Sequence, residues 1–108
     1  MTIDCAGLRL YPGYLDHDAQ AALLAALREV FMAAPLFAPR MPKSGRPFTV
    51  RMSNCGPLGW LSDEAGYRYA PTHPATGRPW PPIPDALLAT WHELGGYPFP
   101  PEACLILE

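Results

Sequence analysis

The sequence predicts an α+β fold in which two helices alternate with short strands and hairpins. Two stretches carry apolar side chains at helical spacing, which indicates two amphipathic helices. Fourteen of the 15 prolines lie between Pro35 and Pro101, and proline excludes both a long helix and a central strand. A chain of 108 residues is at most one small domain.

The N-terminal part predicts a strand followed by a helix. Gly7 to Tyr11 alternates apolar and polar residues as a strand does, and Pro12-Gly13 then turns the chain. Asp16 can cap the first helix, which should end before Pro35. Its apolar face is predicted to consist of Leu23, Leu24, Leu27, Val30 and Phe31.

The middle of the chain predicts loops and short strands. Residues 35–46 form an irregular basic loop, residues 48–52 alternate as a strand, and Asn54 to Pro57 resembles a turn. Residues 67–69 predict a second short strand that places Tyr67 and Tyr69 on one face. Residues 71–82 form a turn-rich connector around Trp80.

The C-terminal part predicts a second helix and a buried strand. The helix starts near Pro84, is supported by Asp85 and ends at Gly95-Gly96. Its expected apolar face holds Leu87, Leu88, Trp91 and Leu94. Residues 103–106 predict a buried strand.

Cysteine usage and hydropathy bear on the type of protein. The three cysteines are far apart and odd in number, which argues against a disulfide scaffold or structural zinc site and favours a reducing compartment. We interpret each as a small buried apolar residue. No membrane-length apolar run and no secretory leader is evident, so we expect no membrane association and a cytoplasmic protein.

Charge is unevenly distributed along a chain of net charge −2. Residues 40–78 contain six cations and two acids and carry a net charge of +4. The cations of this basic segment are Arg40, Lys43, Arg46, Arg51, Arg68 and Arg78. They are compatible with phosphate contact on one face, or equally with solvated cations on loops.

Aromatic side chains are interleaved with these cations, whereas catalytic residues are not evident. Trp60, Tyr67, Tyr69 and Trp80 lie in the basic segment and could stack on bases, or could belong to the core. The histidines are not spaced as metal ligands, and no nucleophile or phosphate-loop motif occurs. We therefore assign no catalytic and no metal-binding residue.

An ordered set of motifs lies between about residues 45 and 106. The motifs are Met-Ser-Asn-Cys-Gly-Pro-Leu-Gly-Trp at 52–60, Gly-Tyr-Arg-Tyr at 66–69, Pro71, Pro74, Pro-Trp-Pro at 79–81, Pro84, Gly-Tyr-Pro at 96–98 and Ala-Cys-Leu-Ile at 103–106. This set resembles the N-terminal half of the AlkB family, whose members are iron(II)- and 2-oxoglutarate-dependent dioxygenases that repair alkylated DNA and RNA.

The resemblance implies a fold and a set of site residues. The family fold is a double-stranded β-helix, or jelly roll, with a nucleotide-recognition lid. The resemblance implies that this chain is one truncated domain without the catalytic core. Its three segments are an N-terminal strand and helix at 1–40, lid hairpins at 41–83, and the second helix with the first core strand at 84–108. Trp60 would pack against the alkylated base with Met52 beside it, and Tyr67 would contact the substrate backbone near a phosphate. Tyr69 would support the hairpin, and Leu105 would border the 2-oxoglutarate pocket.

The resemblance also implies the chemistry of the whole enzyme. Such enzymes use iron(II) and 2-oxoglutarate to hydroxylate an alkyl group on a base nitrogen, which then leaves as formaldehyde. The substrate would be alkylated DNA, single- or double-stranded, or RNA. This chain departs from the pattern because the H-x-D…H iron ligands and the 2-oxoglutarate-binding arginines have no counterpart. Leu107 also replaces an asparagine, and the loop 42–46 differs.

We therefore expect a nucleotide-recognition fragment that is inactive by itself and binds neither iron nor 2-oxoglutarate. Exposed core-facing surfaces should cause self-association or fraying at the C-terminal strand. Two alternatives remain open: a standalone module that binds single-stranded nucleic acid, and a protein-interaction module without catalysis.

Overall fold

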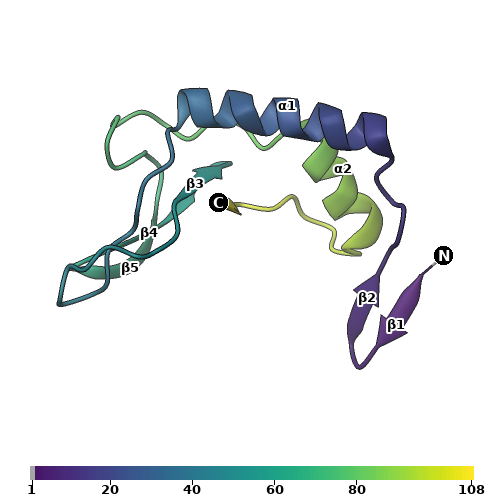
Figure 1. Ribbon diagram of the computed structural model, residues 1–108, viewed down its shortest axis with the longest axis horizontal. Helices are drawn as coiled ribbons and strands as arrows, with labels where there is room; N and C mark the ends of the chain where they lie inside the picture. The colour runs from purple at the N-terminus through teal and green to yellow at the C-terminus, as the bar shows by residue number, and fades with distance from the viewer. Residues whose placement is uncertain (1) are drawn as a thin grey trace.

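The structure is a computed structural model that describes residues 2–108, and it confirms an α+β fold. The fold contains two helices and three two-stranded antiparallel sheets, β1–β2, β3–β6 and β4–β5, and the β1–β2 hairpin projects away from the other elements (Figure 1). The elements are β1 (Ile3–Cys5), β2 (Leu8–Leu10), α1 (His17–Ala33), β3 (Met52–Cys55), β4 (Gly59–Asp63), β5 (Gly66–Ala70), α2 (Asp85–Leu94) and β6 (Cys104–Leu107).

Helix α1 begins and ends where the sequence predicts. The Asp16 carboxylate accepts a hydrogen bond from the Ala19 amide at 2.8 Å, and Ala34 closes the last turn before Pro35. Val30 is buried, but Leu24 is 49% exposed, so its assignment to the apolar face is wrong. Six residues at 100° each place Leu24 about 120° around the helix from Val30, at the edge of the face.

The N-terminal strand prediction is confirmed at Leu8–Leu10, but its partner was missed. β1 pairs with β2 across a two-residue turn in which Ala6 and Gly7 both have positive φ, 52° and 88°. A turn of this kind matches the twist of a hairpin. Every residue of β1 and β2 is exposed, and the alternation of β1 extends over only three residues, Ile3 to Cys5, which is too short a pattern to predict a strand.

The strand predicted at residues 48–52 is displaced toward the C-terminus. β3 spans Met52–Cys55, and the chain bends at Gly56-Pro57 rather than at Asn54. Met52 exchanges backbone hydrogen bonds of 2.9 and 2.8 Å with Phe37 on one edge of β3, and β6 pairs along the other edge. Partners on both edges therefore decide which residues form the strand.

The second hairpin contains one predicted and one unpredicted strand. β5 includes the predicted strand at 67–69, and its partner β4 was missed. The segment 40–43 covers the other edge of β4, because the Arg40 amide donates to Ser62 O at 2.8 Å and the Lys43 amide to Glu64 O at 3.2 Å. The connector after β5 contains no named strand, as predicted.

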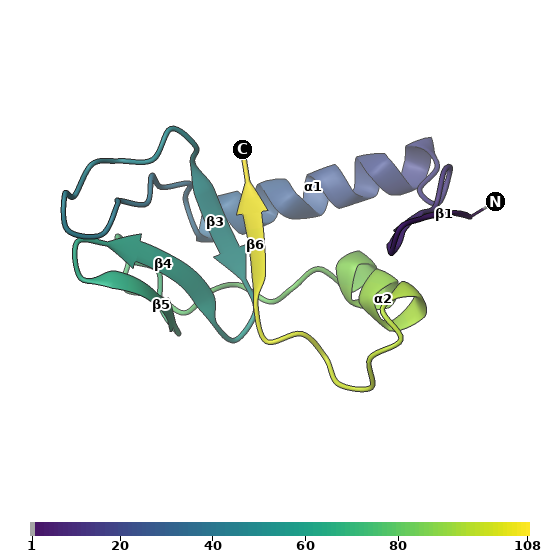
Figure 2. The same cartoon turned by 90° about the horizontal axis from the view of Figure 1, so that it is seen from below.

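Helix α2 and β6 lie close to their predicted positions. Pro84 precedes α2 as its cap residue instead of occupying the first turn, and Gly95 ends the helix. β6 pairs antiparallel with β3 along its whole length (Figure 2), and the Glu108 amide donates to Arg51 O at 2.9 Å. This pairing contradicts the fraying expected at the C-terminal strand. β6 is only half-buried, less than the sequence predicted.

The core consists of two small clusters. One contains Val30, Cys55 and Ile83 between α1, β3 and α2, and the other contains Ala34, Leu61 and Trp80 behind the β4–β5 hairpin. The radius of gyration is 15.6 Å, compared with about 13 Å for a compact chain of this length. Apolar side chains such as Leu8, Leu10 and Met32 are consequently exposed.

Candidate nucleic-acid interface

A cavity of about 310 Å³ lies where strands of the β3–β6 and β4–β5 pairs meet. Its wall is formed by Asn54, Trp60, Tyr69, Ala103 and Leu105. Asn54 lies directly opposite Leu105, and Trp60 lies directly opposite Tyr69. The volume is at the small end of the range for ligand sites, roughly 300–1,000 Å³. It suits one flat ring system rather than an extended ligand.

Asn54 fixes the position of Trp60. Its side-chain amide donates to Trp60 O at 3.1 Å, and its side-chain oxygen accepts from the Trp60 amide at 3.0 Å. These backbone groups therefore point to β3 rather than to β5. Asn54 is 0% exposed, and a buried amide side chain requires such partners. Asn54 was predicted to be a turn residue, and this role was not predicted from the sequence.

Aromatic rings form one side of the cavity region. The Trp60 and Tyr67 rings stack at 5.5 Å between centroids with an interplanar angle of 26°. Phe48 lies at 6.4 Å from Trp60 and was predicted only as a strand residue. Tyr67 and Tyr69 are each 61% exposed, and alternation along β5 places them on one face. Both tyrosine side chains are therefore accessible from solvent beside Trp60.

Trp80 has a structural position, unlike Trp60. It is buried, its indole N–H donates to Ala70 O at 2.8 Å, and it packs against Gly59, where an added Cβ would overlap the ring. His73 is buried beside it. Its Nδ1 accepts from the Ala75 and Thr76 amides, so Nε2 carries the proton and donates to Pro35 O at 2.7 Å. Both rings are thus largely occupied by contacts within the chain and do not line the cavity beside Trp60.

Three cations of the basic segment are engaged within the chain. Arg40 donates to Gly45 O at 3.0 Å, Arg51 pairs with Glu108, and Arg68 forms two bonds of 2.9 and 2.7 Å with Asp63. The hydrogen bond from Arg68, with that from the Ala65 amide, lowers the pKa of the Asp63 carboxyl.

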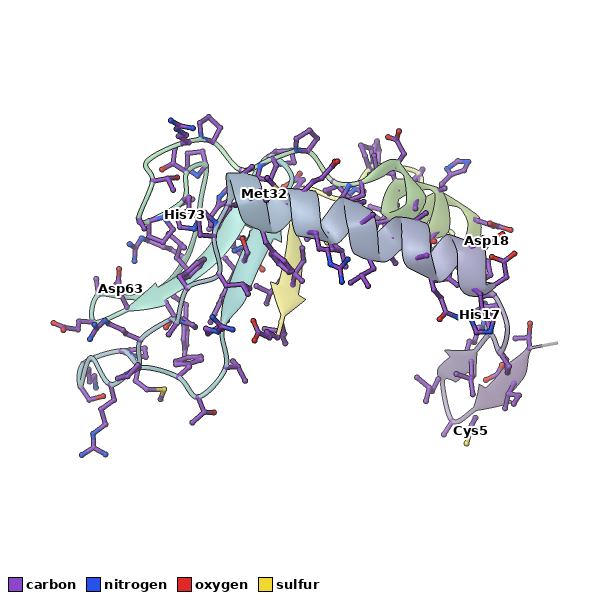
Figure 3. The ribbon with its side chains drawn as sticks, turned by 45° about the horizontal axis from the view of Figure 1, so that its top comes forward. Cys5, His17, Asp18, Met32, Asp63 and His73 are labelled. Carbon is purple, nitrogen blue, oxygen red and sulfur yellow. The ribbon has the colours of Figure 1, made fainter. Side chains whose placement is uncertain are left out.

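The other three cations, Lys43, Arg46 and Arg78, form no ion pair within residues 2–108. Lys43 and Arg46 belong to the segment that borders the β4–β5 hairpin. Gly45 between them is buried and packs against the Glu64 side chain. Asp63 marks the end of β4 near this tip (Figure 3). Within the basic segment, the cations that form no ion pair thus lie at the hairpin tip and at Arg78, and the Glu64 carboxylate lies at the same tip.

The structure brings together most of the residues that the resemblance assigned to the site. Trp60, Tyr69 and Leu105 line the same cavity, and Tyr67 stacks on Trp60. Met52 does not line it: its side chain is 2% exposed, and its backbone is bonded to Phe37. A direct contact between Met52 and a ligand would require this region to open.

The described residues offer no ligand set for iron. In residues 2–108, no three His, Cys, Asp or Glu side chains come together in a group that could hold a metal ion. The cavity wall also carries no cation that could pair with a dicarboxylate such as 2-oxoglutarate. Between residues 2 and 108, no helix has both the length and the apolar character needed to cross a membrane.

Comparison with known proteins identifies the family. The sequence model of the 2OG-Fe(II) oxygenase superfamily matches residues 7–108. The chain belongs to this superfamily. The match includes β2 and α1, well beyond the stretch from about residue 45 to 106 that carries the motifs.

Individual relatives confirm the resemblance to AlkB within the superfamily. The chain is 46% identical over 100 residues to the alpha-ketoglutarate-dependent dioxygenase AlkB homolog of Caulobacter vibrioides, covering 93% of this chain and 45% of that protein. It is 36% identical over 97 residues to the alpha-ketoglutarate-dependent dioxygenase AlkB of Escherichia coli, covering 82% of this chain and 43% of that protein. The chain thus spans about half the length of these curated relatives.

Proposed function

We propose that this chain is the nucleotide-recognition part of an AlkB-type dioxygenase that removes alkyl groups from base nitrogens of DNA or RNA and releases formaldehyde. The observation that carries the proposal is the cavity walled by Trp60, Tyr69 and Leu105. Base–aromatic stacking is worth about 1–3 kcal/mol per base and tolerates any base. Enzymes that act on a base first take it out of the stack, and a cavity of this size would accept one such base.

Each wall of the site has a separate role in this proposal. Trp60 stacks on the extruded base, Asn54 holds the Trp60 backbone in place, and Tyr69 supports the hairpin. Tyr67 meets the nucleic-acid backbone through its exposed hydroxyl, and Lys43 and Arg46 supply charge for phosphates. Met52 would reach the base only when the region around it opens.

The complete enzyme would add the chemistry. We propose that iron(II) and 2-oxoglutarate bind to residues outside this chain, on a jelly-roll core of which β6 is one strand and Leu105 a bordering residue. The ligand types needed for that metal do not gather among residues 2–108. We expect these 108 residues by themselves to be inactive. Self-association through exposed apolar side chains also stays a prediction, for which sedimentation velocity is the test.

The proposal is tested by binding to a labelled single-stranded oligonucleotide with one base methylated on a ring nitrogen. Fluorescence anisotropy should show weaker binding by about 5- to 150-fold in Trp60→Ala, the equivalent of one lost stacking contact. Tyr97→Ala is a matched control, because Tyr97 is also an exposed aromatic residue, but it lies after α2 and contacts Trp91 and Phe99 instead of the cavity.

Unchanged affinity in Trp60→Ala would overturn the base-stacking role and favour a protein-interaction module. The same samples, supplied with iron(II), ascorbate and 2-oxoglutarate, should release no formaldehyde from the methylated oligonucleotide. Formaldehyde release would contradict the expected inactivity of these residues. Strong binding without release fits both a recognition segment and a standalone binding module.

A further inference from the structure

Two of the three cysteines face each other across the β3–β6 pair. Cys55 lies directly opposite Cys104 in the antiparallel register. Cys55 is 0% exposed, Cys104 is half-buried, and the Cys55 Sγ lies 3.9 Å from Cys104 O. Forty-eight residues separate the two in sequence, so only the strand pairing brings them together.

The register sets the backbone separation at this pair. Met52 directs its N–H and C=O toward Phe37, away from β6, whereas Arg51 O accepts from the Glu108 amide. Because these directions alternate along a strand, Cys55 and Cys104 form a hydrogen-bonded pair, for which the Cα atoms lie about 5.5 Å apart. Disulfides prefer Cα separations of about 5.5–6 Å.

The Cβ atoms fit less well than the Cα atoms. Opposed residues in a sheet have Cβ separations of about 4.5–5.5 Å. A disulfide needs about 3.8 Å. The strands would therefore close locally by about 1 Å, and a bond formed under such strain is more easily reduced. The geometry favours a reversible bond over a permanent structural one.

The two thiols differ in ionisation and in access. A hydrogen bond between the two cysteine side chains lowers the pKa of the Cys104 thiol to about 7, against the opposing effect of burial. The same bond and burial raise the pKa of Cys55. Cys104 also lines an apolar groove together with Ile83, Leu87 and Trp91, whereas Cys55 does not. A small oxidant would thus meet the more ionised thiol first.

We propose that Cys104 and Cys55 form a reversible cross-strand disulfide when the protein meets hydrogen peroxide. The Cys104 thiolate attacks the peroxide, the O–O bond breaks, and Cys104 becomes a sulfenic acid while hydroxide takes up a proton as water. The Cys55 sulfur then attacks the Cys104 sulfur, the S–O bond breaks, and hydroxide leaves with the Cys55 proton as a second water. The two sulfurs lose two electrons in total, which the peroxide accepts.

The disulfide would act on the candidate site through its neighbours. Asn54 and Leu105 are the adjacent opposed pair, and both line the cavity. Closure of the strands by about 1 Å would shift the residue that holds Trp60. This consequence rests on the proposed function, whereas the disulfide itself does not.

The test uses Cys5→Ser, because Cys5 is an exposed thiol on the β1–β2 hairpin, away from the β3–β6 pair (Figure 3). After hydrogen peroxide treatment, the intact mass should fall by two hydrogen atoms, and peptide mapping without reduction should identify a Cys55–Cys104 link that dithiothreitol reverses. Cys5→Ser/Cys55→Ser should instead accumulate a sulfenic acid on Cys104 that dimedone traps. The oxidised Cys5→Ser protein should bind the methylated oligonucleotide with an affinity at least about fivefold lower than that of the reduced protein.

Over-oxidation of Cys104 to a sulfinic acid in Cys5→Ser, without a link to Cys55, would overturn the proposal, and so would oxidation of Cys55 before Cys104. These mass measurements need no nucleic acid, so they remain decisive if the proposed function fails. A linked protein with unchanged affinity would overturn the coupling to the cavity. Cys5→Ser alone carries the mass test if the double variant does not fold.

Discussion

Asn54→Ala should both destabilise the protein and weaken base binding, because Asn54 is the direct link between β3 and Trp60. The substitution removes a fully buried side chain that bonds the Trp60 N–H at 3.0 Å and the Trp60 C=O at 3.1 Å. Both backbone groups point away from β5, so the hairpin cannot supply new partners. Trp60 would then be free to shift relative to the cavity.

The magnitude follows from the two backbone groups that lose their partners. Each buried group left without a hydrogen bond costs about 1–3 kcal/mol, so Asn54→Ala should cost about 2–6 kcal/mol. A small domain has a total stability of about 5–15 kcal/mol. At about 4–8 °C of Tm per kcal/mol for a domain close to this size, the smallest expected fall in Tm is about 8 °C.

Urea denaturation followed by circular dichroism measures the loss of stability, and anisotropy with the methylated oligonucleotide measures binding. Gln20→Ala is a matched control, because Gln20 also bonds the backbone through its amide, to Leu15 O at 2.9 Å, but at an exposed position. It should change stability by no more than about 0.5 kcal/mol. If Asn54→Ala lost no more stability than Gln20→Ala and bound the oligonucleotide with full affinity, the role assigned to Asn54 would be refuted.

Three further predictions concern the β4–β5 hairpin and its border. Gly59→Ala should lower the free energy of unfolding, measured by urea denaturation, by about 1–3 kcal/mol, because the added Cβ would overlap the Trp80 ring. In the control Gly77→Ala the added Cβ meets no atom, so this variant measures the cost of positive φ alone. Since the Asp63 pKa is lowered by Arg68, the Asp63–Arg68 pair should add stability above the unfolded pKa of about 3.9 and lose it as pH falls through the folded pKa. Asp63→Asn should therefore match the wild type in acid and be less stable at pH 7, and equal pH profiles would contradict this. Lys43→Gly should be at least as stable as the wild type, because Lys43 has φ of 69°, which favours glycine. The slope of the logarithm of oligonucleotide affinity against the logarithm of salt concentration should decrease by about one in this variant. An unchanged salt slope would exclude Lys43 from phosphate contact.

Helices were predictable from sequence because their signals are local. The Asp16 cap, the apolar spacing and Pro35 all lie within the segment that forms α1, and the structure confirms both ends. Strand boundaries depend instead on partners far along the chain. β3 was displaced in the prediction because Phe37 and β6, which pair with it, lie 15 residues before and about 50 residues after it.

The sequence by itself determined the α+β class, the resemblance to AlkB proteins and the clustering of aromatic residues with cations, because composition and ordered motifs can be read without coordinates. The resemblance assigned Trp60 alone to the base, but only the tertiary structure gave a physical reason that separates Trp60 from Trp80. Both tryptophans occur in the same basic segment, yet Trp80 is buried against Gly59 and Trp60 lines a cavity. Pairing between distant strands likewise set Asn54 opposite Leu105 and Cys55 opposite Cys104. Such neighbours result from packing and register, which the local sequence does not encode.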